Sequence, residues 1–154
     1  MSYDLTFSDP RLDSDAVSGD TAPAAEVWRR VVECVGPHLA NVEPSLNDAY
    51  GELSHEETGI HLQLTATTAS ISMAYWHFEE PANAIRVLYL LAGIVEQETG
   101  LVGTDPQMGM SVQQAGQHLD LVVSAYANVA AMFARRARTE ARIAARRASR
   151  SDAP

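Results

Sequence analysis

The sequence predicts an α+β fold, a ferredoxin-like βαββαβ antiparallel sheet followed by a long C-terminal helix. Segments in which every second residue is apolar, typical of strands, are interleaved with segments in which apolar residues recur every three or four positions, typical of helices. No Pro or Gly interrupts the helical pattern of residues 117–149. A chain of 154 residues with 46% apolar residues is long enough to bury such a core.

The first strand and the first helix are expected in the N-terminal part of the chain. Residues 3–7 alternate apolar and polar side chains, which is typical of a short strand. The Asp-rich residues 8–22 indicate a surface loop. Pro23 can begin a helix, and Gly36 ends it because the next residue, Pro37, cannot continue a helix.

The second and third strands are expected as a hairpin. Residues 60–65 and 71–76 both alternate in polarity, and residues 66–69, which lie between them, have hairpin length. The preceding segment 37–59 is expected to be irregular, with a short extended piece around residues 50–53. A connection of this length is typical of a functional or disordered segment.

The second helix and the fourth strand complete the predicted sheet. Glu79 and Glu80 stand at the positive end of a helix that begins with Pro81 and ends at Gly100. Residues 101–104 form a short fourth strand. Right-handed crossovers then place the first and third strands side by side in the centre, with the helices on one face.

The C-terminal helix is expected to begin near Ser111, which has the capping-box spacing to a Gln three residues later. The apolar seven-residue repeat of residues 112–133 can pack on the domain or on a second copy, so a homodimer through this helix is a candidate. The chain then divides into an α+β domain (1–110), a packed helix (111–134) and an Arg-rich tail (135–154) that projects or frays because it has little apolar surface.

The charge is divided between the two parts of the chain. The net charge is −9, but residues 135–154 hold seven of the eleven cations against two acids and carry +5. Residues 1–134 carry −14, from eighteen acids and four Arg. An acidic body with a basic arm is expected of a protein that meets a charged partner. A GC-rich coding bias is the alternative explanation, since the chain has no Lys.

Known catalytic and metal-binding patterns do not occur in the sequence. The five His residues have no zinc-site spacing, and no phosphate-binding loop or nucleophile elbow is present. Adjacent carboxylates such as Glu56 and Glu57 diverge on any regular element, so they do not form an acid–base pair. We therefore expect a protein that is not an enzyme and uses no cofactor or metal. A small hydrolase or binding enzyme is a third alternative, with its site around Trp76, His77 and Asp105.

The sequence predicts a cytoplasmic protein that does not bind membranes. Its longest apolar run, residues 87–95, is too short to cross a bilayer. The N-terminus has no cationic stretch before an apolar segment, so no export signal is expected. The single Cys34 cannot form an internal disulfide, which fits a reducing compartment.

Two charged surfaces are candidate binding sites. Carboxylates beside aromatic residues are typical of a protein-binding surface, in which the aromatics anchor and the charges steer. A solvated acidic loop with both aromatics buried is the alternative. The candidate partner-binding residues are Tyr50, Glu52, Glu56, Glu57, Trp76, Glu79 and Glu80. On a helix, Arg135, Arg138, Arg142 and Arg146 form a basic stripe that can follow phosphates without sequence specificity.

Several landmarks within residues 1–109 resemble a loose group of small bacterial α+β proteins, some of which look like immunity proteins that neutralise a cognate toxin. These landmarks are Ser2-Tyr3-Asp4-Leu5, Gly59-Ile60, Tyr75-Trp76, Glu98-Thr99-Gly100-Leu101 and Asp105-Pro106-Gln107. The sequence departs from the group at Ser8, where Trp is usual, at Thr104, where Tyr is usual, and in its Arg-rich extension. The resemblance implies no catalytic residue.

The leading functional hypothesis is a non-enzymatic protein–protein interaction module, in particular an immunity-type inhibitor whose acidic face covers a basic toxin site. The alternative is a nucleic-acid-associated or regulatory protein that uses the Arg-rich helix.

Overall fold

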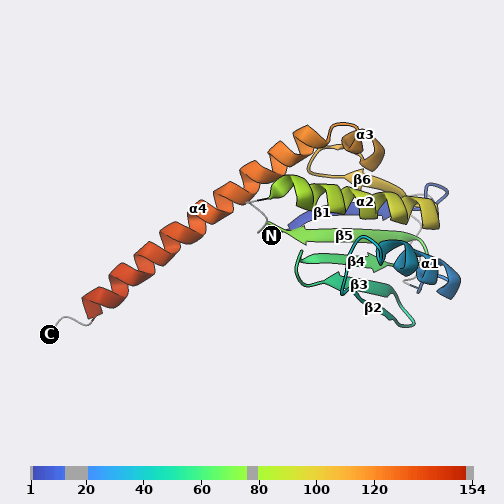
Figure 1. Ribbon diagram of the computed structural model, residues 1–154, viewed down its shortest axis with the longest axis horizontal. Coiled ribbons are helices and arrows are strands. Elements are labelled where there is room, and N and C mark those ends of the chain that lie inside the picture. Colours follow the sequence, from blue (N-terminus) through green and yellow to red (C-terminus); the bar gives the residue numbers. More distant parts are fainter. Residues whose placement is uncertain (1, 13–20, 76–79, 152–154) are drawn as a thin grey trace.

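The computed structural model describes residues 2–12, 21–75 and 80–151, with side chains described through residue 149 in the last segment. It confirms the α+β class and the long C-terminal helix (Figure 1). The elements are β1 (Ser2–Ser8), α1 (Ala25–Val35), β2 (Glu43–Leu46), β3 (Gly51–His55), β4 (Ile60–Leu64), β5 (Thr68–Ala74), α2 (Pro81–Thr99), β6 (Val102–Asp105), β7 (Met110–Ser111), α3 (Val112–Gly116) and α4 (Leu119–Ser151).

The sheet has seven strands in the order β2-β3-β4-β5-β1-β6-β7, and every neighbouring pair is antiparallel. The predicted pairing of the first and third strands is confirmed, because β1 pairs with β5 along its whole length with Leu5 opposite Ile71. The sheet contains more strands than the four that the sequence predicts. Strands β2 and β3 extend one side of the sheet, and the two-residue β7 extends the other.

The segment expected to be irregular forms the β2–β3 hairpin, although the extended piece around residues 50–53 is confirmed as part of β3. The sequence signal is weak because β2 is exposed at every residue and contains Pro44, which a strand tolerates at a sheet edge. In β3, Gly51 lies against the ring of Trp28, and a Cβ there would approach it to 2.6 Å. A buried glycine interrupts the apolar alternation that identifies a strand.

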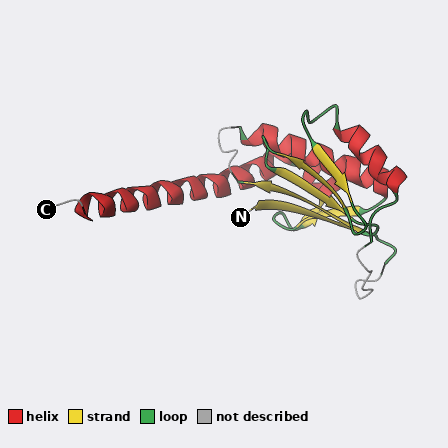
Figure 2. Cartoon of the chain, turned by 90° about the horizontal axis from the view of Figure 1, so that it is seen from below, coloured by secondary structure: helices red, strands yellow, loops and turns green. Residues whose placement is uncertain are grey.

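The helices α1 and α2 cover one face of the sheet (Figure 2). The side chains that face them alternate along the strands and are buried, as Tyr3, Leu5 and Phe7 are in β1. On the opposite face the alternate positions of β1 and β5 are mostly Ser and Thr, and they are partly or fully exposed. This alternation explains why β1, β4 and β5 could be recognised from the sequence.

The C-terminal helical segment is divided in two. The capping box of Ser111 with Gln114 is present, but it begins the short α3, and α4 starts separately at Leu119. The first half of α4 packs on the same chain, with Val122, Tyr126 and Ala130 fully buried. The Tyr126 hydroxyl donates to the carbonyl oxygen of Ala74 at 3.0 Å, which fixes α4 to the end of β5.

Candidate binding surfaces

A shallow hollow of about 570 Å³ lies at the end of the sheet where β3 turns into β4. We call it the acidic hollow, because three carboxylates are among the residues that line it. Its lining residues are Asn41, Glu43, Ser54, His55, Glu56, Glu57, Gly59, Ile60 and His61. The hollow therefore combines the start of β2, the end of β3 and the start of β4, which are paired side by side.

The β3–β4 turn has a defined internal structure. His55 is buried, and its Nδ1 lies 2.8 Å from the Thr58 hydroxyl, which also accepts a hydrogen bond from the Ile60 amide at 3.3 Å. Gly59 closes the turn with φ of 61°, a conformation that glycine adopts without steric cost. Since these contacts fix the base of the turn, Glu56 and Glu57 at its tip present their exposed carboxylates to solvent.

Glu43 adds a third exposed carboxylate to the acidic hollow from the start of the edge strand, where it pairs with Ser54. Glu43 was not among the predicted binding residues, although it precedes Glu52, Glu56 and Glu57 in the same segment of the sequence. Within the described part of the chain, Glu43, Glu56 and Glu57 form no ion pair. The hollow therefore holds negative charge that no ion pair with the described residues neutralises.

Glu52 has a different environment from the turn carboxylates. Its Oε1 lies 2.7 Å from Nε2 of His61 across the β3–β4 pair, and both side chains are about half-buried. When His61 is protonated, this contact is an ion pair. Glu52 therefore has a partner within the chain and offers less free charge than Glu56 and Glu57 do.

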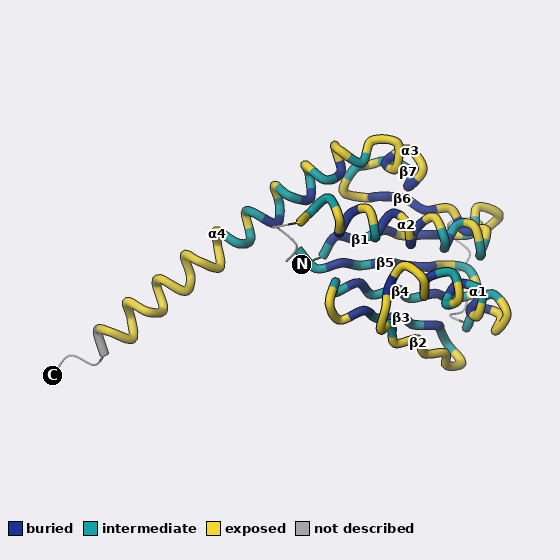
Figure 3. The backbone as a smooth tube through the Cα atoms, in the orientation of Figure 1, coloured by how far each residue is buried: buried dark blue, intermediate teal, exposed yellow. Residues whose placement is uncertain are grey.

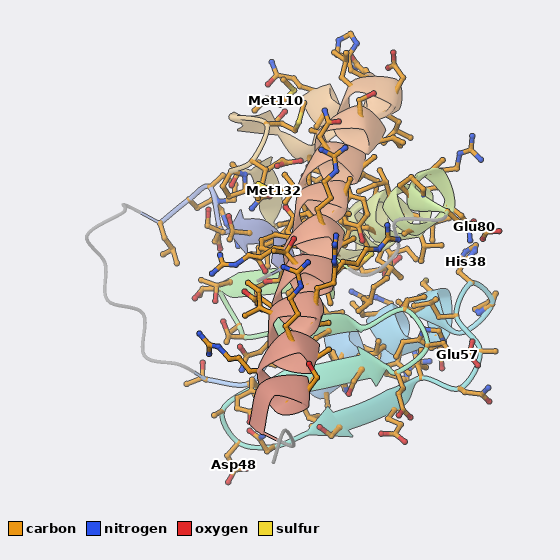
Figure 4. The ribbon with its side chains drawn as sticks, turned by 90° about the vertical axis from the view of Figure 1, so that its left-hand side faces the viewer. His38, Asp48, Glu57, Glu80, Met110 and Met132 are labelled. Atoms are coloured by element: carbon orange, nitrogen blue, oxygen red, sulfur yellow. The ribbon has the colours of Figure 1, made fainter. Side chains whose placement is uncertain are left out.

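The structure does not bring the other predicted residues into this hollow. Half-buried Tyr50 precedes β3, so it stands at the opposite end of that strand from Glu56 and Glu57. Five extended residues separate them by about 17 Å. Figure 4 likewise shows Asp48, in the turn beside Tyr50, well away from Glu57. Trp76 and Glu79 lie outside the described residues, and Glu80 is exposed at the N-terminus of α2.

The second surface is the distal half of α4, residues 135–149, which we call the basic arm. Every residue of this arm is exposed, as the yellow tube of Figure 3 shows. Six arginines lie along it: Arg135, Arg138, Arg142 and Arg146 on one stripe, with Arg136 and Arg147 beside them. The described part of the arm contains one acid, Glu140, which pairs with Arg136 at 3.0 Å. The predicted basic stripe is therefore present and open to solvent.

A buried carboxylate, Asp105, occupies the end of β6. Its Oδ2 accepts hydrogen bonds from the hydroxyls of Tyr3, at 2.5 Å, and Tyr89, and its Oδ1 accepts the Met108 amide at 3.0 Å. Burial, followed by the hydrogen bond to Asp105, raises the pKa of both phenols well above the usual range. Asp105 therefore joins β1, α2 and the β6–β7 turn, and both of its oxygens are engaged within the protein.

The site proposed for an enzyme combined Asp105 with Trp76 and His77, which lie outside the described residues. In the part of the chain that the structure describes, no group of three or more His, Cys, Asp or Glu side chains is arranged to hold a metal ion. No helix within these residues has both the length and the apolar character needed to cross a bilayer. Comparison of the chain with protein-family models, curated proteins and solved structures found no match.

Proposed function

We propose that this protein is a non-enzymatic interaction module whose acidic hollow binds a basic surface of another protein. The observation that carries the proposal is the set of three exposed carboxylates, Glu43, Glu56 and Glu57, which line the hollow and form no ion pair with the described residues. Residues 1–134 carry −14, so the surrounding surface adds to the negative potential of the hollow. Such a field raises the rate at which a basic partner associates.

The hollow is suited to arginine or lysine side chains. The backbone of the turn that carries Glu56 and Glu57 loses little conformational freedom on binding, because the His55–Thr58 contact already orders it. A guanidinium can form two parallel hydrogen bonds with one carboxylate, which supplies specificity in addition to charge. The half-buried pair of Glu52 and His61 borders the hollow on the sheet face.

In its specific form, we propose an immunity-type inhibitor that acts in the cytoplasm and covers a basic site of a toxin. The resemblance of residues 1–109 to immunity-like proteins supports this form, and the single cysteine supports the compartment.

We also propose that β4, β5, β1 and β6, with α1 and α2, constitute a ferredoxin-like unit that β2, β3 and β7 extend. The order β4-β5-β1-β6 within the sheet supports this description.

The test measures binding of a basic protein that this chain recovers in a pull-down at low salt. Glu43→Gln, Glu56→Gln and Glu57→Gln together should slow association at low salt and change dissociation less. A matched control neutralises two exposed acids elsewhere, with Asp48→Asn and Asp120→Asn, and should retain most of the wild-type rate. Equal association rates for the triple variant and the wild type would exclude the hollow from the interface.

The exposed arginine stripe of the basic arm favours a second candidate function, association with nucleic acid. A helix with Arg135, Arg138, Arg142 and Arg146 on one side can follow a phosphate backbone. The acidic body opposes this function, since it repels the same phosphates. Fluorescence anisotropy with duplex DNA tests it: binding should fall steeply with salt and be lost in the Arg138→Glu, Arg142→Glu, Arg146→Glu variant. Binding that this variant retains would exclude the arm.

A further inference from the structure

The basic arm is a helix that is exposed at every residue from 135 to 149. Helix α4 continues without interruption from its buried half into residues 135–149, which are exposed and extend away from the domain (Figure 1, Figure 2). At 1.5 Å per residue, this segment is about 22 Å long. Helices in proteins gain most of their stability from packing rather than from propensity, so a surface that covers the arm would stabilise it.

The charge of the arm limits what can cover it. Two arms packed together would bring twelve arginines into contact with two glutamates, so like charges oppose an arm–arm pair. The arm cannot fold back on its own domain, because the first half of the same helix is fixed to that domain. Tyr126 holds the helix to the end of β5, and the rings of Phe133 and Tyr75 lie in contact with their centroids 5.7 Å apart. The occupant must therefore be an acidic surface on another molecule.

A second copy of this chain carries such a surface in a suitable position. The arm leaves the domain at the same end of the sheet as the β3–β4 turn, on the left of Figure 1. A two-fold rotation that brings two of these ends together can therefore place each arm beside the other copy's turn. The contact is self-complementary, as an interface with two-fold symmetry requires.

We propose that the basic arm binds the acidic hollow of a second copy, and that the protein forms a two-fold dimer with two such contacts. Arg138, Arg142 and Arg146 of one protomer then lie near the carboxylates of Glu43, Glu56 and Glu57 of the other. The dimer uses the hollow assigned above to a basic partner but does not depend on that assignment. If the hollow binds both the arm and a basic partner protein, the two compete for the same carboxylates. The dimer is then a state in which the partner-binding surface is covered.

Sedimentation velocity on the full chain tests the dimer. At about 50 mM NaCl we expect a concentration-dependent dimer, and at about 500 mM we expect it to dissociate, because salt screens exposed charges. An arm variant (Arg138→Glu, Arg142→Glu, Arg146→Glu) and a hollow variant (Glu43→Arg, Glu56→Arg, Glu57→Arg) should each be monomeric. Asp48→Arg with Asp120→Arg, a control away from the hollow, should leave the dimer intact.

Mixing the two charge-reversed variants gives the sharpest result. The acidic arm of one then faces the basic hollow of the other, and the unchanged basic arm faces the unchanged acidic hollow, so a heterodimer should form from two monomeric proteins. Circular dichroism checks that both variants are folded; if the hollow variant is not, Glu43→Gln with Glu56→Gln and Glu57→Gln should still weaken the dimer.

Three results would overturn the proposal. The first is a wild-type protein that is monomeric at low salt, whether or not its arm binds duplex DNA. The second is a dimer that survives reversal of the hollow, and the third is a mixture of the variants that stays monomeric. None of these results concerns the proposed basic partner, whose association with the wild type and with the Glu43→Gln, Glu56→Gln, Glu57→Gln variant is measured separately.

Discussion

Replacing Asp105 should destabilise the fold more than replacing any other carboxylate of the described residues. This side chain is fully buried and accepts hydrogen bonds from two phenols that belong to β1 and α2. Asp105→Ala would leave the hydroxyls of Tyr3 and Tyr89 buried without an acceptor. The variant therefore loses two contacts that hold different parts of the chain together.

The magnitude follows from the two buried donors. Leaving a buried hydrogen-bonding group unsatisfied costs about 1–3 kcal/mol, so two phenols give about 4 kcal/mol for Asp105→Ala. Asp105→Asn retains an oxygen that can accept both hydroxyls but loses the negative charge. Because hydrogen bonds to a charged group are about 1 kcal/mol stronger than neutral ones, the weaker phenol hydrogen bonds should cost the Asn variant about 2 kcal/mol. Both variants also lose the acceptor of the Met108 amide, which adds a similar cost to each and does not change their order.

Equilibrium urea unfolding measures both losses. Asp48→Asn, at an exposed residue in the β2–β3 turn, is the control and should change the free energy of unfolding by less than about 0.5 kcal/mol. The expected order of stability is wild type, then Asn, then Ala. Losses below about 1 kcal/mol for both variants, or an Asn variant no better than Ala, would refute the role assigned to these hydrogen bonds.

Three further predictions concern stability. Because the pKa values of Tyr3 and Tyr89 are raised in the folded protein, the unfolded chain releases these protons above about pH 10 while the folded chain retains them. The free energy of unfolding should therefore be unchanged below that pH and fall above it by about 1.4 kcal/mol per pH unit for each phenol. Urea unfolding from about pH 9 to about pH 11 should show this decrease, and a flat profile would contradict it. Gly51→Ala should lower the free energy of unfolding by about 1–3 kcal/mol because the new methyl group overlaps the Trp28 ring, and a neutral result in the same assay would mean that the ring moves freely. Deleting residues 135–154 should lower the melting temperature only slightly in a dilute sample at high salt, where the protein is expected to be monomeric and residues 135–149 are exposed. A large drop in melting temperature would show that the arm packs on its own domain.

Most of the fold could be predicted from periodicity because one face of the sheet is buried and the other is open. In β1, β4 and β5 this asymmetry produces a regular alternation of apolar and polar residues. The edge strand β2 has no buried residue, so its sequence contains no alternation to recognise. Its pairing with β3 is a tertiary outcome that local sequence does not indicate.

The site was only partly predictable, because charge can be read from a sequence but proximity cannot. The sequence shows that the segment from Glu43 to Glu57 is acidic. The segment folds as a hairpin, however, and this separates Tyr50 from Glu56 and Glu57 and adds Glu43 to them. The pairing of Glu52 with His61 and the hydrogen bond between Asp105 and Tyr3, 102 positions apart, depend on strand register, for which the sequence contains no local signal.

The most direct test of the proposed function is the association rate, measured by stopped flow at low salt, of a basic protein recovered by pull-down with three forms of this protein. These forms are the wild type, the Glu43→Gln, Glu56→Gln, Glu57→Gln variant and the Asp48→Asn, Asp120→Asn control. The acidic hollow predicts a drop of about tenfold for the triple variant, a small change for the control, and convergence of all three at high salt. Equal rates for the wild type and the triple variant at low salt would contradict binding through the acidic hollow.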